Sequence, residues 1–273
     1  MKIDARTSLY GIMGKPLGHT LSPAVHNAAF ASCGINAVYL AFETLHPPGC
    51  REAARALPIK GLSVTIPYKS RILGHLDSVE ATAAEIGAVN TVANRGGALH
   101  GFNTDAGAAL KALEGRMDLE RTSCLLLGAG GAARAVGFAL RGRCAEITIA
   151  NRTGDRAAEL AGALGCRWTP LPDAAGVRAG LVINTTPVGM HPETGRSPVP
   201  VKALEYASVV MDIIYRPRRT ALLNLAERVG CVTIAGEEMF LNQAAAQFSI
   251  WTGLEAPVLE MKTAFDQAVG GIK

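Results

Sequence analysis

The feature that most constrains the fold of this chain is a glycine-rich turn that directly follows a run of apolar residues. Residues 122–127 read Thr-Ser-Cys-Leu-Leu-Leu, the composition of a buried strand, and they lead into Gly128-Ala129-Gly130-Gly131-Ala132-Ala133. Gly128 permits a tight turn, Gly130 lets a backbone approach a pyrophosphate, and Ala133 supplies the small third residue of the Gly-x-Gly-x-x-Ala pattern. A helix from Ala132 to Leu140 would point its N-terminal amides at those phosphates. The pattern predicts a dinucleotide-binding turn, with a glycine-rich turn that binds no ligand as the alternative.

The rest of the chain alternates short β-rich runs with longer Ala- and Leu-rich runs, which indicates βαβ units and a parallel sheet. Strands are expected at Leu9–Met13, Val38–Phe42, Leu62–Ile66, Cys124–Leu127, Glu146–Ala150, Leu181–Asn184, Val209–Ile213 and Cys231–Ile234. Helices are expected at Pro23–Cys33, Ala106–Leu113, Ala132–Leu140, Asp155–Leu164, Thr220–Val229 and Glu238–Trp251. The first helix is the best delimited, with Ser22 as N-cap, Pro23 in the first turn and Gly34 just past the end.

Length and composition favour two domains with sizeable cores. The chain has 273 residues, of which 49% are hydrophobic, and about 150 residues per domain gives roughly 1.8 domains. The loop chemistry changes around residues 100–105, and the strand pattern ends near Gly236. We therefore expect an α/β fold: an N-terminal α/β substrate domain (1–105), a Rossmann-like nucleotide domain with a parallel sheet (106–239), and C-terminal helices (240–273) that pack back on the first domain.

Charge and cysteine usage exclude several classes of protein. The net charge is +4, and the longest basic run is Arg216-Pro217-Arg218-Arg219, so nucleic-acid binding by bulk electrostatics is not expected. The six cysteines lie at least 17 positions apart and form no C-x-x-C pair, which argues against a metal site and fits a reducing compartment. No run approaches the about 18 apolar residues of a membrane span, and the N-terminus lacks an apolar signal core. We expect a soluble, cytoplasmic protein.

The residues after the next expected strand indicate which dinucleotide binds. An NAD site needs an acidic residue about 20 positions after the glycine-rich turn. Here the strand Glu146–Ala150 ends in Asn151-Arg152-Thr153, and Arg156 follows one turn later. A guanidinium group can hold a 2′-phosphate and stack on adenine. The sequence therefore predicts NADP rather than NAD, with an ordinary solvated basic turn as the alternative.

Two polar clusters lie in the first half of the expected substrate domain. In His19-Thr20-Leu21-Ser22-Pro23 the two hydroxyl groups can face one side of a loop at a helix start and cradle a carboxylate, although capping alone would explain Ser22. In residues 61–69, Ser63 and Thr65 alternate with apolar residues and line one strand face, and Lys69 emerges just past the strand end. Ligands of α/β proteins bind at such strand ends, which makes Lys69 a candidate ligand-binding residue, with a solvated surface lysine as the alternative.

A third polar cluster pairs two short motifs. Residues 88–91 read Ala-Val-Asn-Thr, and residues 101–105 read Gly-Phe-Asn-Thr-Asp. Asn90 stands in a β-rich run, where a buried amide must find partners. Asp105 stands at a loop-to-helix start, where capping is the alternative role.

Taken in chain order, H-T-L-S-P, S-V-T-I-P-Y-K, G-A-V-N-T, G-F-N-T-D, G-A-G-G-A, N-R-T, M-F-L-N-Q-A and W-T-G resemble the shikimate 5-dehydrogenase family. The resemblance runs from Tyr10 to about Pro257. The V-T-I-P-x-K, A-V-N-T and N-T-D elements are specific to the family, whereas many dehydrogenases share the glycine-rich loop. The family also has the two-domain architecture expected above, with the nucleotide domain inserted into the substrate domain.

The resemblance implies reversible, NADPH-dependent reduction of 3-dehydroshikimate to shikimate, a step of chorismate and aromatic amino acid biosynthesis. It implies Lys69 and Asp105 as the catalytic acid–base pair. Independently of the resemblance, we expect no metal site and a monomer or homodimer. The implied substrate-binding residues are Thr20, Ser22, Thr65, Asn90, Tyr215 and Gln243. The implied NADP-binding residues are Gly128, Ala129, Gly130, Gly131, Ala132, Asn151, Arg152, Thr153, Arg156 and Met239.

The sequence departs from the family pattern at three places. Thr20 stands where serine is more frequent, Ser63 replaces a frequent asparagine, and Gly236-Glu237-Glu238 replaces a frequent Gly-Leu-Gly. Three other functions stay open. A quinate/shikimate dehydrogenase would typically use NAD, which the two arginines disfavour, and a non-catalytic dinucleotide-binding regulator would not need Lys69, Asn90 and Asp105 together. A methylene-tetrahydrofolate dehydrogenase would need a more aromatic site than 5% aromatic residues supply.

Overall fold

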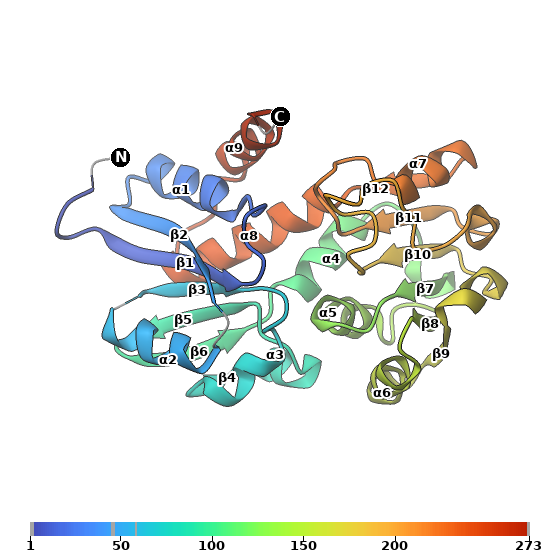
Figure 1. The fold of residues 1–273 in the computed structure, drawn as a ribbon, viewed down its shortest axis with the longest axis horizontal. Helices are drawn as coiled ribbons and strands as arrows, with labels where there is room; N and C mark the ends of the chain where they lie inside the picture. The colour runs from blue at the N-terminus through green and yellow to red at the C-terminus, as the bar shows by residue number, and fades with distance from the viewer. Residues whose placement is uncertain (1–2, 45–46, 58, 272–273) are drawn as a thin grey trace. The chain divides into compact units, whose positions relative to one another are not determined.

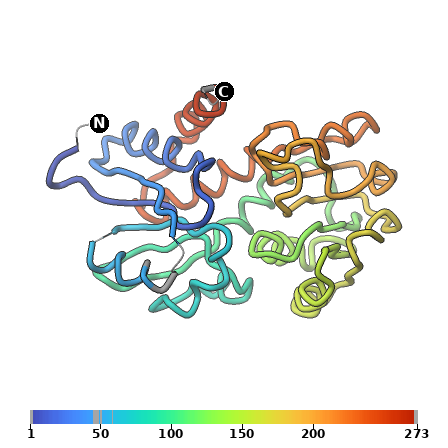
Figure 2. The backbone as a smooth tube through the Cα atoms, in the orientation of Figure 1, coloured from blue at the N-terminus to red at the C-terminus, as the bar shows by residue number. Residues whose placement is uncertain are grey.

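The computed structural model describes residues 3–44, 47–57 and 59–271, and the chain folds into two units. The first unit comprises Met1–Thr104 and Gln243–Lys273, and the second unit comprises Asp105–Asn242. The sequence placed the corresponding boundaries after residues 105 and 239. In Figure 2 the backbone passes from the blue and cyan first unit into the second unit and returns to the first as the red C-terminal helices.

Every strand and helix predicted from the sequence is present, with ends that differ by up to two residues. The first unit contains β1 (Ser8–Gly14), β2 (Ala37–Glu43), β3 (Gly61–Val64), β4 (Ser78–Val79), β5 (Thr91–Arg95) and β6 (Ala98–Phe102). Its helices are α1 (Ser22–Ser32), α2 (Pro47–Ala56), α3 (Ala81–Ile86), α9 (Val258–Gly271) and the C-terminal part of α8 (Gly236–Thr252). The last helix, α9, packs beside α1 (Figure 1). The strands β4, β5 and β6 and the helices α2 and α3 were not predicted, nor was β9 (Arg167–Pro170) of the second unit. The helix α9 was expected only as part of the C-terminal helices at 240–273, without bounds of its own.

The sheet of the first unit is mixed rather than parallel, which corrects the sequence expectation. Its strand order is β2-β1-β3-β5-β6-β4, and β5 runs antiparallel to both β3 and β6. The β5–β6 hairpin turns at Gly96-Gly97, where both φ angles are positive (64° and 92°). A Gly-Gly pair between two short β-rich runs is a hairpin signal, because a two-residue turn of this kind needs left-handed conformations. The antiparallel pairing follows from that turn.

The start of α1 also differs from the prediction. The helix begins at Ser22, its N-cap is Leu21, and no side chain caps it. The Ser22 side chain instead accepts a hydrogen bond from Thr20 Oγ1 at 3.3 Å. Pro23 in the first turn and Gly34, with a φ of 66° just past the end, are confirmed. Ser22 is therefore not explained as a cap.

The second unit has the predicted parallel sheet, in the order β12-β11-β10-β7-β8-β9. Its strands are β7 (Ser123–Leu127), β8 (Glu146–Asn151), β9 (Arg167–Pro170), β10 (Leu181–Asn184), β11 (Val209–Asp212) and β12 (Val232–Ile234). Its helices are α4 (Asp105–Leu113), α5 (Gly131–Leu140), α6 (Gly154–Leu164), α7 (Ala221–Arg228) and the start of α8.

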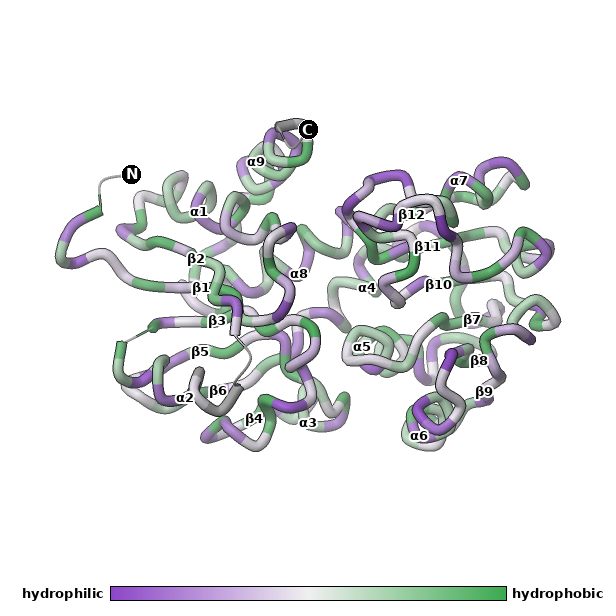
Figure 3. Tube along the Cα trace, viewed as in Figure 1, coloured by the Kyte–Doolittle hydropathy of each residue, from purple (hydrophilic) through white to green (hydrophobic). Residues whose placement is uncertain are grey.

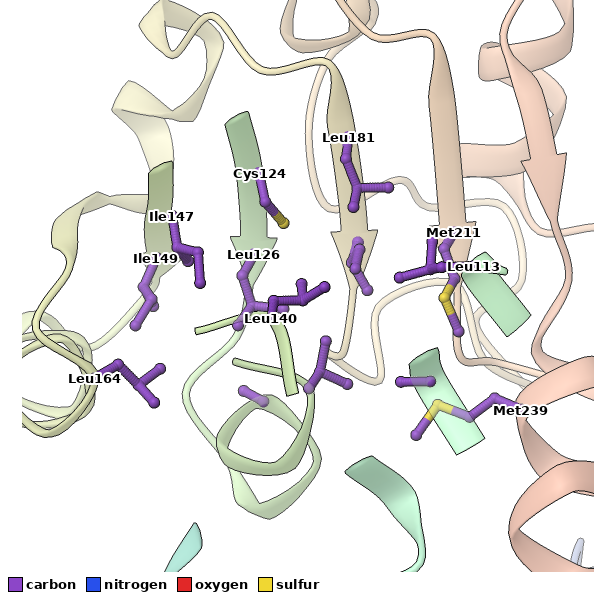
Figure 4. Close-up of a cluster of buried hydrophobic side chains, with 14 of the residues drawn as sticks. Leu113, Cys124, Leu126, Leu140, Ile147, Ile149, Leu164, Leu181, Met211 and Met239 are labelled. Atoms are coloured by element: carbon purple, nitrogen blue, oxygen red, sulfur yellow. The ribbon is translucent and has the colours of Figure 1, made fainter. Parts of the chain in front are cut away.

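Apolar side chains cover both faces of this parallel sheet. On one face Cys124 and Leu126 of β7 pack against α4, α5 and α6, and Figure 4 shows Leu126 close to Leu140. On the other face Leu125 and Leu127 pack with residues of α7. Figure 3 shows hydrophilic as well as hydrophobic residues along α6, as expected for a helix with one buried face. Burial on both faces explains why these strands read as continuous apolar runs.

A buried histidine lies in the first unit. His26 of α1 is 0% exposed, and its ring stacks on Tyr39 at 4.5 Å and lies 5.2 Å from Trp251. Neither ring nitrogen makes a hydrogen bond of good geometry within the described part of the chain. Burial lowers the pKa of His26 to about 3, although the nearby Gln247 side chain opposes part of the shift. The imidazole is therefore neutral in the folded protein.

We expect His26 to make the first unit acid-labile. The folded state excludes the proton that the unfolded chain binds below about pH 6.5, so stability is full above that pH and falls as the pH drops towards 3. A lowering from 6.5 to about 3 corresponds to a loss of about 5 kcal/mol at most. His26→Leu should remove this dependence.

Urea unfolding between pH 4 and 7.5 measures the effect through Trp251 fluorescence. A Trp168→Phe background removes the other tryptophan of the chain, which lies in the second unit. Parallel pH curves for His26→Leu and its parent would contradict the expectation.

Candidate functional site

A hydrogen-bonded cluster in the first unit centres on Asn90, which is 2% exposed and immediately precedes β5. Asn90 Oδ1 accepts from the Thr91 hydroxyl at 2.7 Å and from the Thr104 backbone N–H at 2.8 Å. Asn90 Nδ2 donates to Thr104 Oγ1 at 2.8 Å. These bonds fix the orientation of the amide, and they satisfy a buried polar group that would otherwise be costly.

The β5–β6 hairpin is what brings the two polar motifs of the third cluster together. Thr91 pairs with Phe102, and the Asn90 N–H donates to the Phe102 carbonyl at 3.1 Å. The same register places Asn103 opposite Asn90, and Thr104, the next residue, bonds to the Asn90 side chain. Asp105 follows Thr104 as the first residue of α4. Asp105 is 4% exposed, so it is not a solvated surface cap.

The backbone of Lys69 is held next to the same cluster. The strand β3 ends at Val64, two residues earlier than predicted, and a turn follows in which the Tyr68 N–H donates to the Thr65 carbonyl at 2.9 Å. The Tyr68 hydroxyl donates to the Thr44 carbonyl at 2.7 Å, and the Lys69 carbonyl accepts from the Val89 N–H at 2.8 Å. Lys69 thus joins the residue before Asn90 through its backbone, and both Thr65 and Lys69 are half-buried.

The other polar residues that the sequence singles out in this unit are Thr20, Ser22, Ser63 and Gln243. Thr20 Oγ1 lies 3.3 Å from Ser22 Oγ at the start of α1, so these two hydroxyls do share one side of the chain. Ser63, which was expected to line one strand face together with Thr65, is 4% exposed and bonds to Tyr39 and Gln247. Gln243 is half-buried, and its carbonyl accepts from Thr104 Oγ1 at 3.2 Å.

The glycine-rich turn of the second unit has the geometry that the sequence predicts. Gly128 has a φ of 110°, and a Cβ there would lie 2.6 Å from Thr185 Oγ1. Gly130 is the N-cap of α5, and a Cβ built on it meets no atom within 4 Å, so this side of the turn is open. The loop Gly128–Ala132 therefore offers backbone amides at a helix N-terminus with room for a phosphate group.

Two arginines without an ion pair to any described residue lie just after β8, Arg152 in the turn and Arg156 in the first turn of α6. Both are exposed. Asn151 Nδ2 donates to the Thr153 carbonyl at 2.9 Å, which shapes the turn before α6. By contrast, carboxylates neutralise other arginines of the unit: Arg134 with Glu159, Arg167 with Glu146, Arg218 with Glu237 and Arg219 with Glu227. Uncompensated positive charge is thus found at the corner where a 2′-phosphate is expected.

Tyr215 and Met239, the other predicted site residues of the second unit, are less exposed than Arg152 and Arg156. The Tyr215 ring lies 4.7 Å from that of Phe240, and Met239 is 5% exposed in the hydrophobic cluster of Figure 4.

Sequence reasoning missed the buried Asp212, which anchors the loop that carries Tyr215. This carboxylate accepts from Asn184 Nδ2, the Ile214 N–H and Thr220 Oγ1 at 2.8 to 3.1 Å. Burial raises the pKa of Asp212 to about 6, although the three hydrogen bonds act in the opposite direction. The signal was available in the sequence, because Asn184 and Asp212 end two neighbouring strands.

The described residues also include free cysteines, and they hold neither a metal-binding cluster nor a membrane-spanning helix. Cys33, Cys124, Cys144, Cys166 and Cys231 are free thiols, and burial raises the pKa of Cys144 to about 11, which makes it a weak nucleophile. No group of three or more His, Cys, Asp or Glu side chains in the described ranges is arranged to hold a metal ion. None of the helices described is long and apolar enough to cross a membrane.

Comparison with known proteins gives a consistent result along the chain. Family models match at residues 12–92 (shikimate dehydrogenase substrate binding domain), 109–180 (shikimate/quinate 5-dehydrogenase) and 236–264 (shikimate 5'-dehydrogenase C-terminal domain). Shikimate dehydrogenase (NADP(+)) of Moorella thermoacetica is 44% identical over 99% of this chain and 96% of its own length.

Solved structures agree with the sequence matches. Shikimate 5-dehydrogenase of Thermus thermophilus, in complex with NADP(H) and shikimate, is 38% identical, with a TM-score of 0.87 over 96% of this chain and all of its own. Quinate dehydrogenase of Corynebacterium glutamicum, in complex with NAD, is 32% identical, with a TM-score of 0.87 over 96% of this chain and 99% of its own. The matches cover nearly all of the chain and of these relatives, and the chain belongs to the shikimate dehydrogenase family.

Proposed function

We propose that the protein is an NADP-dependent shikimate dehydrogenase, an enzyme that reversibly reduces 3-dehydroshikimate to shikimate in chorismate and aromatic amino acid biosynthesis. We further propose that it works in the cytoplasm as a monomer or homodimer. The observation that carries the proposal is the Asn90-centred cluster, which ties the Lys69 backbone and the Thr104-Asp105 segment to one fixed amide. Full-length similarity to NADP-dependent relatives supports it.

The polar side chains proposed to bind the substrate can bond to a carboxylate and to the hydroxyl groups of a ring. Thr20 and Ser22 present two hydroxyls at the N-terminus of α1, where helix amides favour an anion. Asn90 and Thr65 would bind ring hydroxyls, and Gln243 and Tyr215 would complete the set. The half-buried positions of Thr20, Thr65 and Gln243 leave them accessible to a small molecule.

Lys69 and Asp105 are the proposed acid–base pair. NADPH, when bound, supplies the hydride for the ring carbonyl. Reduction of that carbonyl develops negative charge on its oxygen, which needs a positive group and a proton donor. Lys69 Nζ can provide both, and Asp105 would favour its ammonium form, because an opposite charge stabilises a charged group.

The residues of the second unit fit a phosphorylated dinucleotide. The open turn at Gly130 and the start of α5 would receive the pyrophosphate through Gly128, Ala129, Gly130, Gly131 and Ala132. Asn151, Arg152, Thr153 and Arg156 would hold the adenosine end with its 2′-phosphate. Met239 would lie against the nicotinamide.

One spectrophotometric assay tests the proposal. Purified protein is given shikimate or quinate, each with NADP or NAD, and nicotinamide reduction is followed. We expect turnover with shikimate and NADP to exceed that of every other pair. Preferred turnover of quinate with NAD would favour a quinate dehydrogenase, and no turnover with any pair would favour a non-catalytic regulator.

Lys69→Ala should lower kcat for shikimate oxidation by about 10²- to 10⁴-fold and change KM much less, because it removes the acid–base group. Steady-state kinetics with saturating NADP measures both constants. Lys60→Ala removes an exposed lysine at the other end of β3 and should leave both constants unchanged. A Lys69→Ala variant altered only in KM would make Lys69 a binding group.

Arg152→Ala should raise KM for NADP by about 10- to 100-fold, since a hydrogen bond to a charged group contributes about 1.5–3 kcal/mol. KM for NAD should change little, so the measured quantity is the ratio of kcat/KM for NADP to kcat/KM for NAD. Arg143→Ala, at another exposed arginine of the second unit, is the matched control. Equal losses with NADP and NAD would show that Arg152 does not recognise the 2′-phosphate.

A further inference from the structure

We propose that Gln247 is a positioning residue for the substrate: its buried side-chain amide fixes the orientation of Asn90 through Thr91. The inference rests on the proposed function, because it assigns a role within the same site. Gln247 lies on α8 one turn after Gln243, so the two side chains share a face of the helix. It is 2% exposed.

The Gln247 amide bridges two neighbouring strands. Its Oε1 accepts from the Ser63 hydroxyl at 2.7 Å, and its Nε2 donates to Thr91 Oγ1 at 3.0 Å and to the Asn90 carbonyl at 3.1 Å. Ser63 of β3 and Thr91 of β5 are directly paired in the antiparallel ladder. The oxygen of one side-chain amide can therefore accept from β3 while its nitrogen donates to the start of β5.

These bonds form part of a chain with a single direction. The Tyr39 hydroxyl donates to Ser63 at 2.6 Å, and Ser63 donates to Gln247. Gln247 donates to Thr91, and Thr91 donates to Asn90 Oδ1. Asn90 Nδ2 in turn donates to Thr104, whose hydroxyl donates to the Gln243 carbonyl. A carbonyl can only accept, so the end at Gln243 sets the direction of every bond before it.

The direction of the chain explains why Gln247 acts on Asn90 at a distance. The Thr91 hydroxyl has one proton; its oxygen accepts from Gln247 Nε2, which directs that proton to Asn90 Oδ1. Without this donor the Thr91 hydroxyl is free to rotate, and the Asn90 amide loses one of the bonds that orient it. The Asn90 backbone would stay in place, because its carbonyl also accepts from the Val64 N–H at 2.7 Å. The expected consequence is a misoriented side chain on an intact strand.

Two substitutions separate the acceptor role of Gln247 from its donor role. Gln247→Glu can still accept from Ser63 but has no amide proton for Thr91, and Gln247→Leu removes both functions. We expect each to raise KM for shikimate by about tenfold or more, which is the effect of one buried hydrogen-bonding group. KM for NADP should stay within about twofold, because Ser63, Asn90 and Thr91, to which the Gln247 side chain bonds, belong to the first unit.

Trp251→Phe is the matched control for a purely structural effect. Its Nε1 donates to the Val92 carbonyl at 3.0 Å, so it too removes a hydrogen bond from α8 to β5. We expect a lower melting temperature with an unchanged KM for shikimate. Kinetics at 25 °C, melting temperature and circular dichroism are measured for all variants.

The outcomes distinguish the inference from the proposed function. The positioning role would be overturned if the wild-type protein oxidised shikimate with NADP and the KM for shikimate of the Gln247 variants matched that of Trp251→Phe. The proposed function would then still stand. A wild-type protein without this activity would overturn both.

Ser63→Ala provides a second test should the Gln247 variants fail to fold. It leaves Gln247 in place without its hydrogen-bond donor, and the network predicts a rise in KM for shikimate there as well. An unchanged KM in Ser63→Ala would count against the inference.

Discussion

The paired hydrogen bonds between Asn90 and Thr104 are the interaction on which the first unit's candidate site depends. They close the open end of the β5–β6 hairpin, whose other end is the Gly96-Gly97 turn. Both residues are buried, so an unpartnered amide there would cost far more than one exposed to water. The Asn90 side chain thus links the two arms of the hairpin just beyond their last ladder pair, Thr91 with Phe102. Lys69 is joined to the same segment, because its carbonyl accepts from the Val89 N–H.

The two units meet their polar requirements in different ways. In the first unit, neutral groups such as Ser63, Thr91 and Gln247 satisfy one another in a buried network, which gives a fixed shape without buried charge. In the second unit, the charged groups Arg152 and Arg156 are exposed, and the turn at Gly130 is open. A rigid neutral network suits discrimination among ring hydroxyls, whereas exposed guanidinium groups suit a phosphate that brings its own charge.

Local rules in the sequence predict the second unit well and the first unit less well. Strands such as β7 and β10 are buried on both faces, so their apolar runs identify them, and the glycine-rich turn has one conformation that fits. The strand β4 has only two residues, too few to form a pattern. The β-rich run that contains Asn90 was recognised, but it was not assigned as the strand β5, which is short and begins directly after that buried asparagine. The N-cap prediction for Ser22 was wrong because Leu21 already has helical backbone angles. The burial of Ser63 depends on Gln247, 184 residues away, and no local pattern records such a contact.

One long-range bond also explains how the first unit tolerates its insertion. The second unit runs from Asp105 to Asn242, and the residues on either side of it, Thr104 and Gln243, are joined by a 3.2 Å hydrogen bond. The chain therefore leaves the first unit and returns to it at one point, which is the arrangement in which an inserted domain costs its host least. The same point is the end of the directional chain that starts at Tyr39. Gln243 and Gln247 share one face of α8, so this helix completes the hydrogen-bond network around Asn90. The candidate site of the first unit therefore needs residues that follow the second unit in the sequence.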